Sequence, residues 1–225
     1  MACKVRMLAF ETSSFACSVA LQNGDHIELR HEIIPMQQAQ RILSMIKEVL
    51  EACSLTVNDL DAIAYGNGPG SFTGIRIANT VAQGLGFAAN LPIIPISSLA
   101  ALAQAAFFEQ QQTHLLVSLD ARMDQVYWAR YQVDQNSLAE LVGKERLCAP
   151  GEVKIEKASM DIKWFAVGDG WEKYRAELIE SIGFQPEILT SPLFPTAEAV
   201  LRLAKPKFNK GECVTAATAM PAYLR

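Results

Sequence analysis

The segment 66–76 reads Gly66-Asn67-Gly68-Pro69-Gly70-Ser71-Phe72-Thr73-Gly74-Ile75-Arg76. An apolar run at residues 62–65 precedes it, and a helical pattern continues from it to Ala89. A buried strand, a glycine-rich turn and a helix are therefore predicted in that order. Such a turn places backbone N–H groups at the positive end of a helix, where an anion or the backbone of a partner can bind.

The two common nucleotide-binding glycine motifs are absent from this segment. A P-loop needs Lys and Ser or Thr after its last glycine, but Ile75 and Arg76 follow Gly74 here. A dinucleotide-binding turn needs a third glycine at the place where Ser71 and Thr73 stand. The segment thus predicts a scaffold of the nucleotide-handling type that lacks the usual phosphate contacts.

Hydrophobic periodicity on both sides of this segment predicts a complete α/β lobe over residues 1–109. Ser97 or Ser98 is expected to cap its last helix. The order βββαβαβα is that of the ribonuclease-H-like half-domain, which the actin, sugar-kinase and Hsp70 superfamily uses twice. The expected strands are residues 5–12, 16–21, 26–34, 62–65 and 92–96, and the expected helices are residues 38–53, 71–89 and 97–108.

Residues 110–225 begin the same order again but do not complete it. The predicted fold class is therefore α/β with two ribonuclease-H-like lobes, of which the C-terminal one, residues 110–225, is reduced. Its expected strands are residues 115–119, 126–133, 141–147 and 164–167, and its expected helices are residues 171–182 and 197–204.

Composition places the chain among ordinary globular proteins and limits its chemistry. It has 225 residues, of which 50% are hydrophobic and 20% charged, and its net charge of −4 disfavours a chain that holds nucleic acid alone. No apolar run is long enough to span a membrane and no leader precedes the first strand, so a cytoplasmic location is expected. The only local basic excess is Lys205, Lys207, Lys210 and Arg225, a pattern typical of a solvated face.

Cysteine and histidine patterns offer neither a metal site nor a catalytic thiol. None of these residues is paired at metal-ligand spacing, so the cysteines are interpreted as reduced, mostly buried side chains. They are Cys3, Cys17, Cys53, Cys148 and Cys213, and the histidines are His26, His31 and His114.

Four blocks of the sequence resemble the TsaB family, also called YeaZ. They are residues 8–13 (Leu-Ala-Phe-Glu-Thr-Ser), the segment 66–77, residues 120–129 and the terminal Tyr223-Leu224-Arg225. The resemblance spans nearly the whole chain. It implies the non-catalytic, dimerising subunit of the bacterial machinery that makes threonylcarbamoyladenosine on transfer RNA.

The catalytic relative TsaD carries His-x-x-x-His at the start of its third helix, and these histidines bind a metal. The resemblance aligns Ser98 and Leu102 with those two positions. In the second lobe, Asp120-Ala121-Arg122 replaces a phosphate-binding Gly-Gly turn. We therefore expect no cofactor in the isolated chain, with ATP or ADP and the metal bound by partner subunits. Weak nucleotide-contact candidates at a subunit interface are Glu11, Thr12, Asp120 and Arg122.

The helices 38–53 and 71–89 are the expected partner surface. Ala78, Ala82 and Gly86 recur every fourth residue, and such small residues let another helix approach closely. The alternative is that this stripe packs on the chain's own sheet. The residues expected at the interface are Arg41, Met45, Gly68, Pro69, Gly70, Ser71, Phe72, Thr73, Gly74, Ile75, Arg76, Asn79, Ala82, Gln83 and Gly86.

The resemblance implies that the chain binds TsaD as a heterodimer and forms a homodimer when alone. It further implies that the ATPase TsaE joins the complex and that tRNA is contacted only indirectly. TsaD would then transfer threonylcarbamoyl to N6 of the adenosine beside the anticodon of ANN-decoding tRNAs. Two other classes stay open from the residues alone, namely an ATP-dependent kinase that uses Glu11, Thr12 and Asp120, and a metallopeptidase.

Overall fold

The structure is a computed structural model that describes residues 5–155, 162–189 and 194–224. Its chain divides into two compact units. The first comprises Met1–Ala101 and Pro195–Ala222, and the second comprises Leu102–Phe194 and Tyr223–Arg225. Cys3 and Arg225 lie outside the described residues. No helix of the described residues is long and apolar enough to cross a bilayer.

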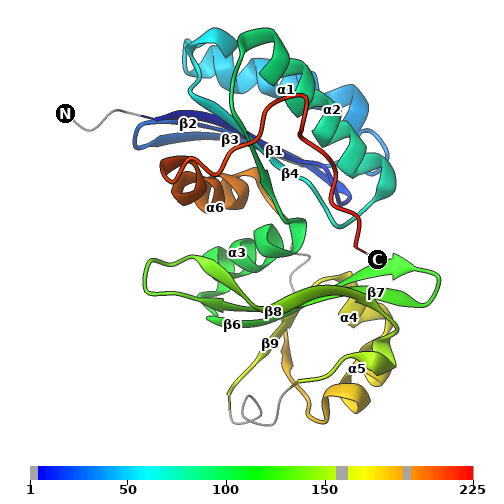
Figure 1. The fold of residues 1–225 in the computed structure, drawn as a ribbon. Coiled ribbons are helices and arrows are strands. Elements are labelled where there is room, and N and C mark those ends of the chain that lie inside the picture. The colour runs from blue at the N-terminus through cyan, green and yellow to red at the C-terminus, as the bar shows by residue number, and fades with distance from the viewer. Residues whose placement is uncertain (1–4, 156–161, 190–193, 225) are drawn as a thin grey trace. The chain divides into compact units, whose positions relative to one another are not determined.

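The first unit contains a five-stranded sheet in the order β3-β2-β1-β4-β5 (Figure 1). β2 pairs antiparallel with both of its neighbours, whereas β4 and β5 run parallel to β1. Because β1 and β4 are central and covered on both faces, their sequences are apolar without alternation. The strands are β1 (Arg6–Glu11), β2 (Ala16–Asn23), β3 (His26–Ile33), β4 (Ala62–Gly66) and β5 (Ile93–Ile96).

Helices cover both faces of this sheet. α1 (Gln38–Ala52) and α2 (Phe72–Ala89) lie on one face, and α6 (Ala197–Asn209) lies on the other (Figure 1). A short 3-10 turn, η1 (Val57–Asp59), follows α1, and α3 (Ser98–Gln110) follows β5. The Ser97 hydroxyl caps α3, accepting hydrogen bonds from the backbone N–H groups of residues 99 and 100. The predicted order βββαβαβα is confirmed.

The place of α6 differs from the sequence expectation, which put all of residues 110–225 in the second lobe. α6 packs on β1, β4, β2 and β5 of the first sheet. The Ser18 hydroxyl in β2 accepts a hydrogen bond from the backbone N–H of Ala197 at the start of this helix. The sheet face opposite α1 and α2 needs an apolar cover, and α6 supplies it with side chains such as Val200 and Leu201.

The second unit repeats the same topology with a sheet in the order β10-β9-β6-β7-β8. β6, β7 and β8 are antiparallel, and β9 and β10 run parallel to β6. Among the described residues, only the 3-10 turn η2 (Pro150–Glu152) lies between β8 and β9, where the first unit has α1. The expected reduction of this lobe is thus confirmed. The strands are β6 (His114–Arg122), β7 (Gln125–Val133), β8 (Ala139–Cys148), β9 (Phe165–Val167) and β10 (Glu187–Ile188).

The helix expected at residues 171–182 is two helices in the structure. α4 (Asp169–Lys173) ends at Tyr174, and α5 (Arg175–Ile182) begins directly after it. The break follows from packing, because Tyr174 and Trp171 both point into the core under the second sheet. The Trp171 indole N–H also donates to the carbonyl of Leu116, at 2.9 Å. Tertiary contacts therefore interrupt a locally favourable helix.

Two of the three glycines of α2, Gly74 and Gly84, predict opposite effects of an alanine substitution. A Cβ at Gly74 would lie 2.0 Å from the carbonyl oxygen of Thr12, whereas nothing lies within 4 Å of one at Gly84. We expect Gly74→Ala to lower the free energy of unfolding by about 1–3 kcal/mol or more. Gly84→Ala should raise it by about 0.5–1 kcal/mol, because alanine favours the helix. Urea unfolding of both variants measures this, and equal effects would contradict the close approach.

Candidate functional site

A buried carboxylate occupies the end of β1, where the sequence placed a weak nucleotide-contact candidate. Glu11 is fully buried, and its Oε2 accepts a hydrogen bond from the Ser98 hydroxyl at 2.8 Å. Its Oε1 accepts one from the backbone N–H of Ser13 at 2.5 Å. A Cβ at Gly66 would lie only 1.7 Å from Oε2, so the carboxylate rests directly on the backbone of β4. Burial raises the pKa of Glu11, although the bonds from Ser13 and Ser98 act in the opposite direction.

The glycine-rich segment forms hydrogen bonds with the backbone at the end of β1. The backbone N–H of Ser71 donates to the carbonyl of Ser13 at 2.7 Å, and the Thr12 hydroxyl donates to the carbonyl of Gly74 at 2.7 Å. Ser71 also caps α2, since its hydroxyl accepts from the N–H of Gly74. The loop is therefore tied to the end of β1 through several internal hydrogen bonds.

Asp120 and Arg122, the other two nucleotide-contact candidates, belong to a charged cluster in the second unit. The Asp120 carboxylate accepts bonds from the Lys173 ammonium at 3.2 Å and from the Arg122 side chain at 3.1 Å. The backbone N–H of Arg122 donates to it as well, at 2.9 Å. Burial acts to raise the pKa of Asp120, but these bonds outweigh it and the net pKa is lowered. The carboxylate is thus held as an anion by its own neighbours.

More than half of the residues expected at the partner interface are buried inside the first unit. A Cβ at Gly86 would lie 2.7 Å from Cδ1 of Ile93, and the Asn79 side chain accepts a bond from the Tyr65 hydroxyl at 2.8 Å. The small-residue stripe Ala78, Ala82, Gly86 therefore packs on the chain's own sheet, which corrects its assignment to a partner helix. The buried members of the set are Met45, Gly68, Pro69, Gly74, Ile75, Asn79, Ala82 and Gly86.

The remaining members of the set lie at the surface. Phe72 is 66% exposed, and the Arg76 guanidinium carbon lies 3.1 Å from the centroid of its ring. Ser71 and Thr73 are exposed, and Gly70, Arg41 and Gln83 are partly buried. The Gln83 amide donates to the carbonyl of Ala219. Sequence reasoning missed the other exposed apolar side chains of this unit, which include Phe15, Ile33, Met36, Leu43 and Phe87.

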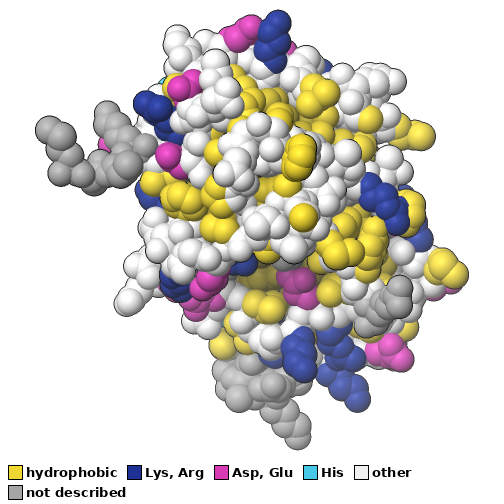
Figure 2. Space-filling model, turned by 45° about the horizontal axis from the view of Figure 1, so that its top comes forward, with side chains coloured by type: hydrophobic (Ala, Val, Ile, Leu, Met, Phe, Trp, Pro, Cys, Tyr) yellow, Lys and Arg dark blue, Asp and Glu magenta, His cyan; other side chains and the backbone are white. Residues whose placement is uncertain are grey.

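Leu43 illustrates why these residues were missed. It lies beside the apolar positions of α1 in sequence, yet it is 59% exposed while its neighbours Ile42 and Met45 are fully buried. In a sequence, a leucine at the edge of a helix's buried face looks the same as a leucine within that face. In the view of Figure 2, hydrophobic side chains occupy much of the centre of the forward face of the first unit. Most of its charged side chains lie towards the margins.

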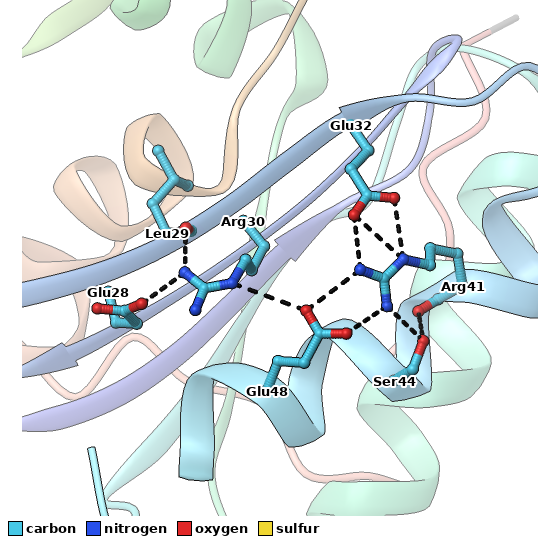
Figure 3. Close-up of polar contacts among 7 residues, drawn as sticks. All are labelled: Glu28, Leu29, Arg30, Glu32, Arg41, Ser44 and Glu48. Atoms are coloured by element: carbon cyan, nitrogen blue, oxygen red, sulfur yellow. Dashed lines mark hydrogen bonds and ion pairs between the residues drawn. The ribbon is translucent and has the colours of Figure 1, made fainter. Parts of the chain in front are cut away.

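Arg41, another expected interface residue, is the centre of an ion-pair network that joins α1 to β3 (Figure 3). Its guanidinium binds Glu32 at 2.6 Å and Glu48 at 2.5 Å. Arg30 binds Glu28 at 2.5 Å and approaches Glu48 at 3.7 Å. Hydrogen bonds from Arg41 lower the pKa of both Glu32 and Glu48. The network fixes one long side of α1 against the edge strand β3.

Comparison with known proteins shows which family has this sequence and fold. A family model described as TsaD, the tRNA N6-adenosine threonylcarbamoyltransferase, matches residues 32–202. The TsaB protein of Escherichia coli, named for tRNA threonylcarbamoyladenosine biosynthesis, is 37% identical over 98% of this chain and 95% of its own length. The chain belongs to the TsaB family. TsaB of Haemophilus influenzae is 38% identical over 97% of this chain and 93% of its own length.

Solved structures agree with the TsaB assignment. YeaZ from Pseudomonas aeruginosa superposes with a TM-score of 0.90 at 40% identity, covering 98% of this chain and all of its own. The α/β fold with two ribonuclease-H-like lobes is therefore shared with YeaZ over nearly the whole of this chain. The chain accordingly has a part in the biosynthesis of threonylcarbamoyladenosine on tRNA.

The buried Glu11 carboxyl predicts a pH dependence of stability. Because its folded-state pKa lies above the ordinary value of 4.5, stability falls as the pH rises from 4.5 through the folded-state pKa. Glu11→Gln keeps two hydrogen-bonding atoms but cannot ionise. We expect this variant to be more stable than the wild type at pH 8, with the difference shrinking as the pH approaches 4.5. Urea unfolding between pH 4.5 and pH 8 measures it.

Glu32→Gln is the control with the opposite sign. The folded-state pKa of Glu32 is lowered by Arg41, so its stabilising effect is present above the ordinary value and is lost as the pH falls. This variant should be less stable than the wild type at pH 8 and equal to it in acid. Identical pH profiles for the two variants would overturn the environment assigned to Glu11.

Proposed function

We propose that this chain is the non-catalytic subunit that binds and activates TsaD for transfer of threonylcarbamoyl to N6 of the adenosine beside the anticodon of ANN-decoding tRNAs. The observation that carries the proposal is the hydrogen bond between Ser98 and Glu11. Ser98 stands where the resemblance places the first metal-binding histidine of TsaD. Its hydroxyl is instead committed to a carboxylate of its own chain.

The second histidine position supports the same interpretation. Leu102 is fully buried, as is Ser98, and a leucine side chain has no atom that can bind a metal. The described residues contain no cluster of three His, Cys, Asp or Glu side chains that could hold a metal ion. In this proposal TsaD supplies the metal and the nucleotide site, and the present chain supplies a surface that holds TsaD in its active arrangement.

The docking surface we propose lies on the exposed sides of α1 and α2 and the β3–α1 turn. Met36 in that turn is 92% exposed, Leu43 on α1 is 59% exposed and Phe72 on α2 is 66% exposed. Apolar side chains of this size are favoured at protein interfaces because their burial removes a large area from water. The Arg41 ion pairs with Glu32 and Glu48 connect α1, which carries Leu43, to the neighbouring strand β3.

The wider assembly follows from the same proposal. A second copy of the chain would use an overlapping surface, so the homodimer should compete with the TsaD heterodimer. TsaE, the ATPase, would join the complex, and ATP or ADP would be held by the partner subunits. The complex would act in the cytoplasm, where tRNA is modified.

Leu43→Arg tests the docking surface. A charge at this exposed position should weaken association with TsaD at least tenfold without unfolding the chain, because burying an unpaired guanidinium at an interface is costly. Co-purification with TsaD and isothermal titration calorimetry measure the affinity. Ala82→Arg is unsuitable, since Ala82 is fully buried and the substitution would disrupt the core.

Leu141→Arg is the matched control. Leu141 lies on β8 in the second unit and is 45% exposed. The same change there should leave TsaD binding and the reconstituted tRNA modification unaffected. Undiminished binding by the Leu43 variant, or equal loss in both variants, would refute the proposed surface.

A further inference from the structure

Among the described residues, the second sheet has no counterpart of the helix α1. On the first sheet, α1 packs against β2 and β3. On the second sheet, Trp128 of β7 packs against Trp171 of α4, but the described residues between β8 and β9 form only η2. A shallow depression of about 310 Å³ opens between β7, β8 and the residues that follow η2. We call it the basic depression, after its lining.

A bulge in β8 shapes this depression. Trp128 pairs with Arg146, yet Arg130 pairs with Val142, so β8 contains two more residues than β7 over the same interval. Gly143 lies in the bulge with a φ of +89°, and a Cβ there would lie 3.5 Å from Nη2 of Arg130. Bulges of this kind re-aim side chains and end regular pairing. Here the extra residues add Lys144 to the lining of the depression.

The lining carries a strong local charge. Four of its residues are cations, namely Arg130, Lys144, Arg146 and Lys154, and no described carboxylate is among them. Lys144, Arg146 and Lys154 are exposed and form no ion pair with any described residue. Glu145, between two of these cations in sequence, accepts a bond from the Tyr131 hydroxyl on the opposite face of the sheet. Four positive charges therefore gather on a chain whose net charge is −4.

We propose that the basic depression binds the phosphate backbone of tRNA while TsaD acts on it. The proposal rests on the function proposed above. An open, shallow surface with several separate cations fits a chain of phosphates, which lysine and arginine contact without reading sequence. The Trp128 ring is only 3% exposed, so it offers no platform on which a base could stack.

An acidic protein segment is the rival occupant, and the lining disfavours it. Stable protein interfaces need an apolar centre that is buried on docking. The apolar side chains here, Trp128 and Ile155, are already buried within the unit, and Val142 is half-buried. The basic depression has exposed positive charge but no exposed apolar centre, so it is better suited to the RNA backbone than to a protein segment.

The triple variant Lys144→Gln, Arg146→Gln, Lys154→Gln tests the proposal. The matched control is Lys205→Gln, Lys207→Gln, Lys210→Gln, which removes the same charge from the other basic cluster, at the end of α6. Fluorescence anisotropy with a labelled tRNA transcript, from 50 to 200 mM KCl, is measured for each chain in complex with TsaD and alone. Loss of three phosphate contacts should weaken binding about 10- to 100-fold near 100 mM salt and reduce the slope of log K against log salt by about 2–3. The control should match the wild type.

The outcomes separate this inference from the proposed function. Unchanged tRNA affinity in the triple variant, or an equal loss in the control, would overturn the basic depression as an RNA site. Loss of TsaD binding with unchanged tRNA affinity would identify a protein-docking surface and overturn it too. Failure of the wild-type chain to bind TsaD would instead refute the proposed function, and the titrations of the chain alone would still test the RNA contact.

Discussion

The close approach of the glycine-rich segment to the end of β1 is the constraint on which the first unit depends. Gly74 meets the backbone at Thr12, and Gly66 meets the carboxylate of Glu11, at distances that exclude any Cβ. The loop can then donate and accept hydrogen bonds with residues 12 and 13. This contact joins β1, β4 and the start of α2, the three elements around which the sheet is built.

The same contact connects the fold to the proposed function. In a nucleotide-binding relative, an open loop at this place would leave N–H groups for phosphate. Here the N–H of Ser71 donates to the chain's own backbone at Ser13, and the Glu11 carboxylate at the end of β1 accepts a hydrogen bond from Ser98. The surfaces that we propose for binding other molecules lie elsewhere, on the exposed sides of α1 and α2 and in the basic depression.

Several features were predictable because they depend on local pattern. The order βββαβαβα, the cap at Ser97 or Ser98 and the reduced second lobe all follow from hydrophobic periodicity and turn chemistry. The partner-facing stripe was not predictable in this way. Ala78 and Ala82 have the spacing of a helix interface, but the interface they form is with the chain's own core. Leu43 shows the converse, an apolar residue in a core-like pattern that faces solvent.

The amino-acid sequence was sufficient for the fold class and the family resemblance, because both depend on residue types at fixed spacing. Three features required the folded chain. α6 covers the first sheet although it follows the second sheet in sequence. Ser98 forms a hydrogen bond with Glu11, which lies 87 residues away in sequence. Four cations spread over residues 130–154 line one depression. Each depends on contacts between segments distant in sequence, which only the packing of sheets and helices brings together.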